Sequence, residues 1–469
     1  MRDIAIETCH RLLQHMGTSA EDTGGAIAIA GADPIVASPH RLGTAAAAAL
    51  AAEGVGIAAI WRMRSGRGQD VSVDLRRAVV PGLRTVFHVS QGGKPLRWRP
   101  RSGWQSFFRT RDNRQIYLLR VRDYLDMLLG LLELLQCTND NGAVASAVAR
   151  WHSGDLEDAI AAAKLVGVVA RRRDEWLDHP QGQWLAGRPP IDLEKIADGP
   201  PEPFGPAPRP LTGVRVLDVS HVLAGPAASR LLAEQGADVL HIASYRHPDT
   251  LDKTVDTSFG KRSAYLDLDR DRDRARLAEL VRGCDVFVQS WRLGSLQKRG
   301  FGPREVAKLR PGAIYVSLSA YGAGGPWAAR GGYDPVGQVA SGLAVAEGSF
   351  EAPTLAPTGT VNDYLTAYLA AAGAVGALYR RAREGGSYQV EVSLTRSSMF
   401  VLDLGQLETR PKPEQVFGLE ALPSDLRTTL SPLGEVAYPA PITDFSETKP
   451  YWERPCGVVG ADQPVWLPR

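Results

Sequence analysis

Residues 213–242 read GVRVLDVSHVLAGPAASRLLAEQGADVLHI, and this stretch decides the fold. A short apolar strand leads into a small-residue helix, and a second apolar strand follows it. Two more apolar runs, DVFVQS at residues 285–290 and GAIYVSLS at residues 312–319, continue the alternation. Strands that alternate with helices are typical of a parallel sheet with right-handed crossovers. The sequence therefore predicts an α/β protein with a Rossmann-like parallel sheet within residues 211–400.

The chain changes character on both sides of this region. A length of 469 residues is too great for one ordinary core, so several units are expected. Residues 101–190 mix strand and helix patterns and predict a smaller α+β domain. Residues 191–210 are rich in proline and predict an extended linker. Residues 401–469 are also rich in proline and lack clear periodicity, which predicts an extended C-terminal tail.

The first hundred residues contain a partial internal repeat. Residues 44–75, TAAAAALAAEGVGIAAIWRMRSGRGQDVSVDL, align without gaps with residues 363–394, DYLTAYLAAAGAVGALYRRAREGGSYQVEVSL. The aligned pairs include Leu50 with Leu369, Gly54 with Gly373, Arg62 with Arg381, Gly66 with Gly385, Val71 with Val390 and Val73 with Val392. Two alanine-rich helices can match by chance, but this register continues through a glycine turn into a strand. Residues 1–100 are therefore interpreted as a partial copy of the large-domain helix and strand, with Thr44 at the place of Asp363.

Composition excludes several classes of protein. A net charge of +2 argues against a protein that binds nucleic acid mainly through phosphate contacts. Four cysteines without CxxC spacing suit a reducing compartment, so we expect a cytoplasmic protein. The nine histidines form no metal-binding pattern, and no metal site is predicted. The charged start is unlike a signal peptide, and the alanine run at residues 44–52 is short and mild for a membrane span, so no membrane association is expected.

Three segments at predicted strand ends carry candidate ligand contacts. Gly225 permits close backbone approach and Pro226 suits the first position of a helix, so the amides that follow can face an anion. A plain strand–helix turn is the alternative, and the lack of GxGxxG weakens a nicotinamide or flavin site. The other two segments bear basic residues, which are either a solvated surface or cations for a phosphate-rich ligand. They are FGKRSAYLDL, with Lys261 and Arg262, and SWRLGSLQKRGFG, with Arg292, Lys298 and Arg299.

Asp363 stands at the start of the predicted helix in APTGTVNDYLTAYLAAAGAVGALYRR. An aspartate there stabilises a helix by about 0.5–2 kcal/mol through its amides and its dipole. A carboxylate nucleophile would benefit from the same position, because nearby amides stabilise charge on an adduct. The residues alone leave both interpretations open.

Taken in chain order, these segments resemble the class III CoA-transferase family, which includes formyl-CoA and carnitine CoA-transferases and the related α-methylacyl-CoA racemases. The resemblance runs from residue 211 to 396 and also rests on IYVSLSAYGAGGPWAARGGYD, which carries Tyr333 and Asp334. Residues 40–190, including EWLDHPQGQ, resemble the later part of the same fold, namely the helix and strand after the catalytic aspartate and the small domain.

The resemblance implies a mechanism and a set of site residues. Asp363 matches the family's aspartate, which attacks an acyl-CoA thioester, forms a mixed anhydride and then an aspartyl-CoA thioester, and passes CoA to an acceptor carboxylate. CoA and acyl-CoA are substrates, and no tightly bound cofactor is implied. The residues implied to bind CoA are His221, Val222, Ala224, Lys261, Arg262, Ser290, Trp291 and Lys298. Tyr333 and Asp334 are implied to shape the acyl pocket.

Some departures keep alternatives open. Ala243 and Ser244 replace the acidic and basic residues that many members carry, which leaves Arg246 as a substitute. Tyr333 stands where the racemases use histidine, which argues against α-carbon proton transfer. An acyl-CoA racemase or isomerase and a non-catalytic acyl-CoA-binding homologue are the alternatives. The partial copy makes either a homodimer or a monomer with an internal pseudo-dimer the expected assembly.

Overall fold

A seven-stranded sheet forms the centre of the computed structural model, which describes residues 4–96, 106–120, 125–412 and 426–468. The strand order is β11-β10-β9-β12-β13-β14-β8, and all neighbouring pairs are parallel except β14 with β8. The strands are β8 (Asp192–Ala197), β9 (Arg215–Asp218), β10 (Asp238–Ala243), β11 (Lys261–Tyr265), β12 (Val286–Gln289), β13 (Ile314–Ser319) and β14 (Ser387–Ser393). The predicted α/β fold with a mostly parallel sheet is confirmed.

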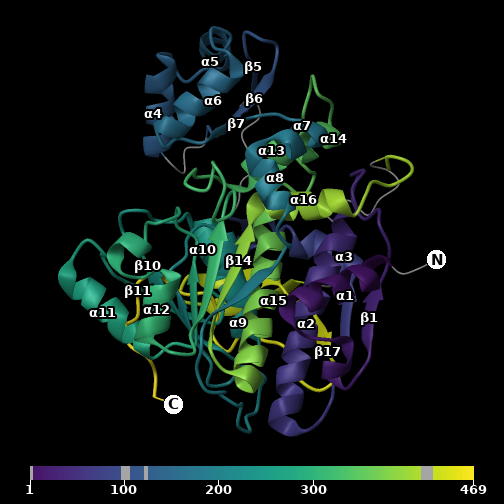
Figure 1. Cartoon of the computed structure of the whole chain (residues 1–469), viewed down its shortest axis with the longest axis vertical. Helices are drawn as coiled ribbons and strands as arrows, with labels where there is room; N and C mark the ends of the chain where they lie inside the picture. The colour runs from purple at the N-terminus through teal and green to yellow at the C-terminus, as the bar shows by residue number, and fades with distance from the viewer. Residues whose placement is uncertain (1–3, 97–105, 121–124, 413–425, 469) are drawn as a thin grey trace.

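Helices cover both faces of this sheet, as parallel strands require (Figure 1). The helices between and after its strands are α9 (Ala224–Glu234), α10 (Leu251–Thr257), α11 (Asp271–Arg282), α12 (Pro303–Leu309), α13 (Asp334–Ser341), α14 (Leu343–Glu347), α15 (Val361–Glu384) and α16 (Leu394–Asp403). Helix α15 is buried along nearly its whole length, because alanine and glycine let neighbouring elements approach it closely. It lies between the sheet and the N-terminal part of the chain.

The N-terminal part packs on α15 through a second long helix. Its elements are α1 (Ile4–Met16), β1 (Ile27–Ala30), α2 (Leu42–Ser65), β2 (Val71–Asp74) and α3 (Leu75–Arg77). Strands β1 and β2 pair in parallel. Gly56 of α2 packs against α15, and a Cβ at this position would lie 2.6 Å from Val375 Cγ1. By length and composition α2 could cross a membrane, contrary to expectation, but its apolar window of 18 residues is entirely buried inside the protein, as in the core helix of many folds.

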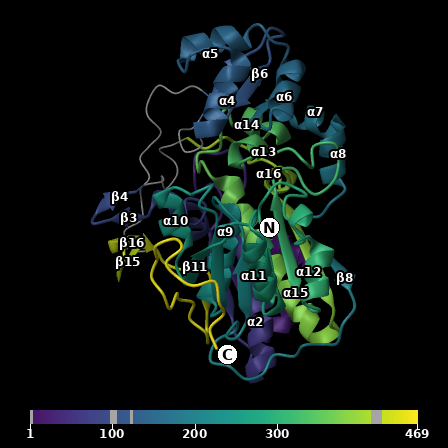
Figure 2. The same cartoon turned by 90° about the vertical axis from the view of Figure 1, so that its left-hand side faces the viewer.

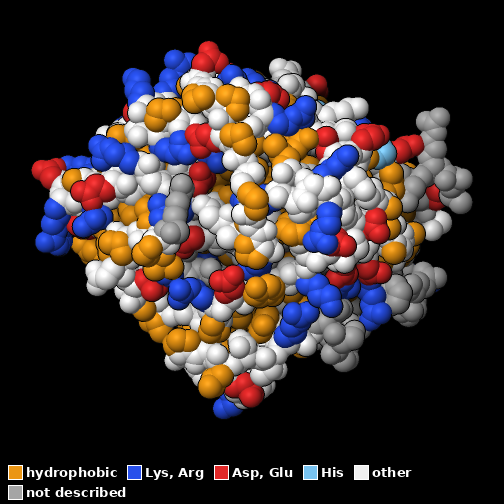
Figure 3. All heavy atoms as spheres, turned by 90° about the horizontal axis from the view of Figure 1, so that it is seen from below, with side chains coloured by type: hydrophobic (Ala, Val, Ile, Leu, Met, Phe, Trp, Pro, Cys, Tyr) orange, Lys and Arg blue, Asp and Glu red, His pale blue; other side chains and the backbone are white. Residues whose placement is uncertain are grey.

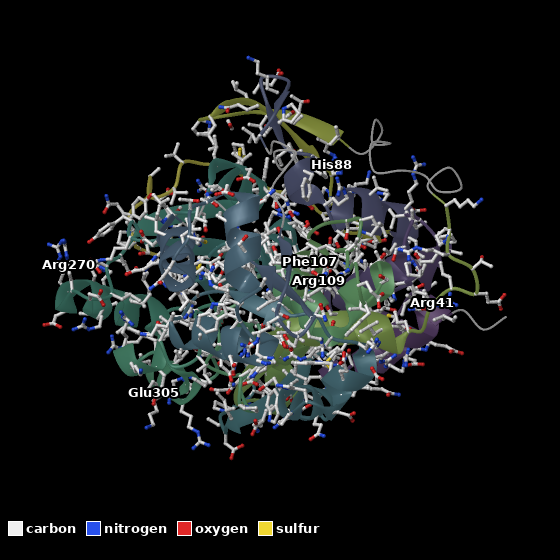
Figure 4. All side chains as sticks on the ribbon, turned by 90° about the horizontal axis from the view of Figure 1, so that it is seen from above. Arg41, His88, Phe107, Arg109, Arg270 and Glu305 are labelled. Carbon is white, nitrogen blue, oxygen red and sulfur yellow. The ribbon has the colours of Figure 1, made fainter. Side chains whose placement is uncertain are left out.

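The small domain stands at one end of the molecule (Figure 1). Its elements are β5 (Phe107–Arg109), β6 (Gln115–Leu118), α4 (Leu125–Leu135), α5 (Asn141–Val148), α6 (Ser153–Ala162), β7 (Gly167–Val169), α7 (Arg173–Asp178) and α8 (Pro180–Ala186). Strands β5, β6 and β7 form an antiparallel sheet with its own apolar cluster. Seen from above, Phe107 and Arg109 of β5 lie over the middle of the molecule, and Arg270 and Glu305 lie at its edge (Figure 4).

Two expected extended segments contain regular structure. Residues 191–210, expected to be a linker, contribute β8, which pairs with the open edge of β14. This is feasible because no proline lies between Ile191 and Gly199 to remove a ladder donor. Residues 401–469, expected to be an extended tail, contain β15 (Leu426–Ser431), β16 (Gly434–Pro439) and β17 (Asp444–Phe445).

These C-terminal strands pair with the beginning of the chain. Strand β17 joins β2, and the β15–β16 hairpin joins β3 (Ser90–Gln91) and β4 (Lys94–Pro95) (Figure 2). Gly434 has φ 92° and directly follows the turn at Pro432 and Leu433, a conformation that glycine adopts without strain. The face away from the small domain shows charged side chains of both signs scattered among apolar ones (Figure 3).

Candidate functional site

A cavity of about 670 Å³ lies at the carboxyl ends of the parallel strands. Residues that follow β9, β10, β11, β12 and β13 line it on one side, and Leu125, Asp126 and Met127 of α4 line it from the small domain. The carboxyl edge of a doubly wound sheet is where such folds bind ligands, because loops and helix N-termini converge there. This cavity is therefore the candidate site.

Asp363 reaches this cavity from the first turn of α15. Asp363 is only 9% exposed, so its carboxylate is largely shielded from bulk water. The backbone N–H groups of Asn362 and Asp363 both donate to Oδ2 of Asp334, at 2.6 and 3.0 Å. Thr360, which precedes the helix, makes no side-chain cap. The cap of α15 thus comes from a distant residue, Asp334.

The loop before α9 forms the wall opposite Asp363. His221 donates its backbone N–H to Ser290 Oγ at 3.0 Å, and its ring stacks on Trp291 with centroids 4.1 Å apart. Trp291 donates its indole N–H to the Val219 carbonyl at 2.6 Å. Burial lowers the pKa of His221 to about 4, so the imidazole is neutral near pH 7. This wall therefore offers a flat aromatic surface and no fixed positive charge from His221.

Val222, in the same loop, has φ 69°, which is a strained conformation for a β-branched residue. Its backbone N–H donates to both carboxylate oxygens of Asp249 at 3.0 Å, which holds the strained turn in place. Strain of this kind persists only where the surroundings impose it, and it is common next to functional sites.

Seven of the residues predicted for the site line this cavity. They are His221, Val222, Ala224, Ser290, Trp291, Tyr333 and Asp363. They come from four separate parts of the chain, and the sheet brings them together because the strands that precede them end at one edge. Four others that we predicted, Lys261, Arg262, Lys298 and Asp334, do not line it.

Lys261 and Arg262 are committed to buried ion pairs instead. Lys261 donates through Nζ to Asp218 Oδ2 at 2.9 Å, and it lines a smaller neighbouring cavity of about 300 Å³. Arg262 pairs with Asp238 at 3.1 Å, at the amino end of β10 and away from the carboxyl edge. Neighbouring residues of a strand point to opposite faces, so the two side chains cannot share one ligand.

Lys298 and Asp334 also differ from expectation. Lys298 is exposed in a single 3-10 turn, Gln297–Arg299, outside the cavity lining. Asp334 is buried and caps α15 with its carboxylate, and it also accepts a bond from Gln338 Nε2. Its carboxylate is thus directed to the helix and not to the acyl pocket.

The cavity lining also contains charged residues outside the set that the resemblance implied. Arg246, named only as a substitute, pairs with Asp267 at 3.0 Å, and Arg299 pairs with Asp269 at 2.7 Å. Bonds from the Tyr245 hydroxyl and then from Arg246 lower the pKa of Asp267 to about 2. The sequence signal for Asp267 and Asp269 was the run LDLDRD, because its carboxylates directly follow the end of strand β11.

Two arginines join the sheet domain to the small domain beside the cavity. Arg292 donates to the Lys164 carbonyl at 2.7 Å, and Arg330 pairs with Asp158 at 2.6 Å. Nothing in the sequence indicated Arg330. Across the ranges described above, no cluster of three His, Cys, Asp or Glu side chains could hold a metal ion.

Comparisons with known proteins agree with this architecture. The model of CoA-transferase family III matches residues 211–420. The chain is 37% identical over 207 residues to an acetyl-coenzyme A transferase, nodX, of Hypoxylon pulicicidum, covering 42% of this chain and 34% of that protein. It is 34% identical to an acetyl-CoA:oxalate CoA-transferase of Acetobacter aceti, over 39% of this chain and 51% of that protein. It is 30% identical to a formyl-CoA:oxalate CoA-transferase of Streptomyces coelicolor, over 55% of this chain and 59% of that protein.

The chain therefore spans about a third to three fifths of the length of these curated relatives. Among solved structures, a CAIB/BAIF family protein from Brucella suis is 24% identical, with a TM-score of 0.40 over 48% of this chain and 65% of that one. Rv3272 from Mycobacterium tuberculosis is 27% identical, with a TM-score of 0.38 over 40% of this chain and 56% of that one. The family match runs through the strands from β9 to β14 and through α15, so residues 211–420 of this chain are similar to CoA-transferase family III.

Proposed function

We propose that the protein transfers CoA between an acyl-CoA and a carboxylic acid, with Asp363 as the nucleophile. The observation that carries this proposal is the position of Asp363. Its shielded carboxylate lines the same cavity as the loop before α9, at the edge of the sheet where ligands bind. A carboxylate in a partly dry site is a stronger nucleophile than one in bulk water, because it has lost part of its hydration shell.

The reaction exchanges one acyl partner for another without a net change in bond type. A carboxylate oxygen of Asp363 attacks the thioester carbonyl, the C–S bond breaks, and CoA leaves as a thiolate. The thiolate attacks the aspartyl carbonyl of the mixed anhydride and expels the donor acid, which gives an aspartyl-CoA thioester. The acceptor carboxylate then attacks the aspartyl-CoA thioester, which gives a second mixed anhydride and releases the CoA thiolate. The thiolate attacks the acceptor carbonyl of this anhydride, which yields the new acyl-CoA and restores Asp363. No proton is gained or lost, so no acid or base residue is required.

The shape of the cavity supports an extended substrate such as CoA. Arg246 follows β10 and Asp267 follows β11, whereas Asp363 lies beyond β13 and beside Leu394, which follows β14. From β11 to β14 the sheet crosses five strand spacings of ~4.8 Å, or about 24 Å. We assign the nucleotide to the Arg246 and Arg299 end and the thioester to the Asp363 end. Trp291, whose ring stacks on His221, follows β12, and β12 lies between β10 and β14 in the sheet.

The proposal is tested by trapping the acyl-enzyme. The protein is incubated with acetyl-CoA, formyl-CoA and succinyl-CoA, treated with hydroxylamine, and digested for mass spectrometry. We expect a hydroxamate on Asp363, and we expect Asp363→Asn to lose both the hydroxamate and at least about a thousandfold of the transfer rate.

Two results would overturn it. CoA binding without any adduct would favour a non-catalytic acyl-CoA-binding protein. Uptake of deuterium at the α-carbon of a branched acyl-CoA, with no adduct, would favour a racemase or isomerase. The matched control is the double variant Asn362→Asp/Asp363→Asn, which moves the carboxylate by one residue to a fully buried position and should not form a hydroxamate at residue 362.

A further inference from the structure

Two parts of this chain fold into the same unit. Helices α2 and α15 both contain 24 residues, and each is followed by a strand and then by a helix. A Cβ at Gly54 would lie 2.6 Å from Val71 Cγ1, and a Cβ at Gly373 would lie 2.5 Å from Val390 Cγ1. In both units, therefore, the long helix packs through a glycine on a valine of its own strand.

The start of the next helix is also alike in the two units. The Asp74 side chain accepts a bond from the Arg77 backbone N–H at 3.0 Å, and Ser393 accepts one from Arg396 at 3.3 Å. Both are N-cap residues, and each occupies the same place relative to its long helix. The sequence similarity of residues 44–75 and 363–394 thus corresponds to matching contacts.

A third feature shared by the two units lies outside the aligned sequence. It is an aspartate that caps the N-terminus of each long helix. Asp33 accepts bonds from the N–H groups of Gly43 and Thr44 at 2.9 and 2.8 Å. Asp334 likewise accepts the N–H groups of two successive residues, Asn362 and Asp363, although it uses Oδ2 for both whereas Asp33 uses one oxygen for each; a proline follows each aspartate. The loops between cap and helix differ in length, so the alignment of the helices does not reveal this match.

The two units differ at the residue that the cap holds. The Thr44 hydroxyl turns back and donates to Asp33 Oδ2 at 2.9 Å, which closes the helix end. An ionised Asp363 has no proton to donate to the Asp334 carboxylate. Its side chain lines the cavity instead. In the first unit the residue held by the cap, Thr44, bonds back to the capping aspartate. In the second unit the residue held by the cap is Asp363, the carboxylate of the proposed function.

The cap on α15 is itself fixed from several directions. Asp334 accepts a bond from Gln338 Nε2, and its backbone carbonyl accepts one from Asn362 Nδ2 at 3.0 Å. Ser398 Oγ in turn donates to Asn362 Oδ1 at 2.8 Å. A fully bonded, buried network of this kind holds a backbone in one geometry. The first turn of α15 thus has little freedom to rotate Asp363 away from the cavity.

We propose that Asp334 is a positioning residue for Asp363, and that Asp33 is the same cap in a degenerate copy of the unit that carries no nucleophile. This rests on the proposed function, in which Asp363 attacks the thioester. A reacting group displaced by about 1 Å can lose about a hundredfold in rate, so a cap that sets the Asp363 backbone acts on turnover and not only on stability. The cap on α2 acts on stability alone.

The chain supplies its own matched control for this proposal. Asp334→Ala and Asp33→Ala each remove one aspartate that accepts two helix N–H bonds, and we expect similar, small decreases in melting temperature. With acetyl-CoA, or with the donor that gives the adduct, Asp334→Ala should lower kcat about 10–100-fold with little change in KM. Asp33→Ala should keep kcat within about twofold. Single-turnover formation of the hydroxamate should slow by the same factor as kcat.

Equal kcat losses in the two variants would overturn the proposal, because the cap would then act only through stability. An unchanged kcat in Asp334→Ala would also overturn it. If Asp334→Ala does not fold, Asp334→Asn, which keeps one acceptor oxygen, gives the same comparison against Asp33→Asn. Failure of the proposed function is seen separately, as the absence of any adduct on Asp363 in the unaltered protein.

Discussion

Lys261 shows how a residue predicted to bind a ligand can be a structural cation. Its ammonium group donates to Asp218 Oδ2 at 2.9 Å and to Ser229 Oγ at 2.8 Å, and both partners are buried. Removal of one partner from a buried ion pair leaves the other charge uncompensated, which costs about 3–5 kcal/mol. We expect Lys261→Met to lower the free energy of unfolding by this amount, measured by urea denaturation followed by circular dichroism.

The control is Lys298→Met, which alters an exposed lysine of the same predicted set. It should change the free energy of unfolding by at most about 0.5 kcal/mol. Equal losses in the two variants would show that Lys261 is not held in the buried pair.

Sequence could predict part of the site and not the rest, for reasons that differ by residue. The resemblance to the CoA-transferase family implied site roles for Asp363 and His221, whereas the residues alone left the role of Asp363 open. The sheet topology explains why both residues line one cavity. The cap from Asp334 could not be predicted from the sequence, because it joins residues 29 positions apart and depends on the direction of one carboxylate. The ion pair of Lys261 could not be predicted either, because the sequence does not tell toward which face of β11 its side chain points.

Among the elements, the two long helices make a prediction about packing. A Cβ at Gly54 or Gly373 would approach a strand valine to 2.6 or 2.5 Å, closer than real Cβ contacts allow. We expect Gly54→Ala and Gly373→Ala each to lower the free energy of unfolding by about 1–3 kcal/mol, because added volume forces the helix from its strand. Denaturant unfolding of the two variants checks this.

Gly154 of α6 supplies the control for helix glycines. A Cβ there meets no atom within 4 Å. Alanine has the higher helix propensity, so Gly154→Ala should leave stability unchanged or raise it by up to about 1 kcal/mol. A similar loss at all three positions would contradict the packing argument, and a loss at only one of Gly54 and Gly373 would contradict the equivalence of the two units.

The elements that sequence predicted are those whose signal is local. The parallel strands and the helices α2 and α15 appear as apolar runs of the right length, and the structure has them. Strand β8 and the β15–β16 hairpin were missed, because their neighbouring prolines favour extended chain. What makes them strands is pairing over long distances, such as β16 with β3. Such pairing leaves little trace in the local pattern.

At the scale of the whole molecule, the cavity depends on two units that the chain holds together. The arginines Arg292 and Arg330 of the sheet domain bond to Lys164 and Asp158 of the small domain. These two contacts join the small domain, whose α4 lines the cavity, to the sheet domain. The sequence analysis predicted both units, but not that the site would lie between them.

The packing of α2 on α15 leads to a prediction about assembly. Every residue of α2 from Leu42 to Trp61 is buried, and α2 packs on α15 of the same chain. A second copy of the chain cannot use that surface of α15 without unfolding the first unit. We therefore expect a monomer of 50.6 kDa with one CoA site and one reactive aspartate per chain. Light scattering after size exclusion, over a hundredfold range of concentration, measures the mass, and the hydroxamate yield counts one adduct per chain. A concentration-independent dimer of twice this mass would contradict the prediction, because it would mean that the copy within the chain does not replace a partner.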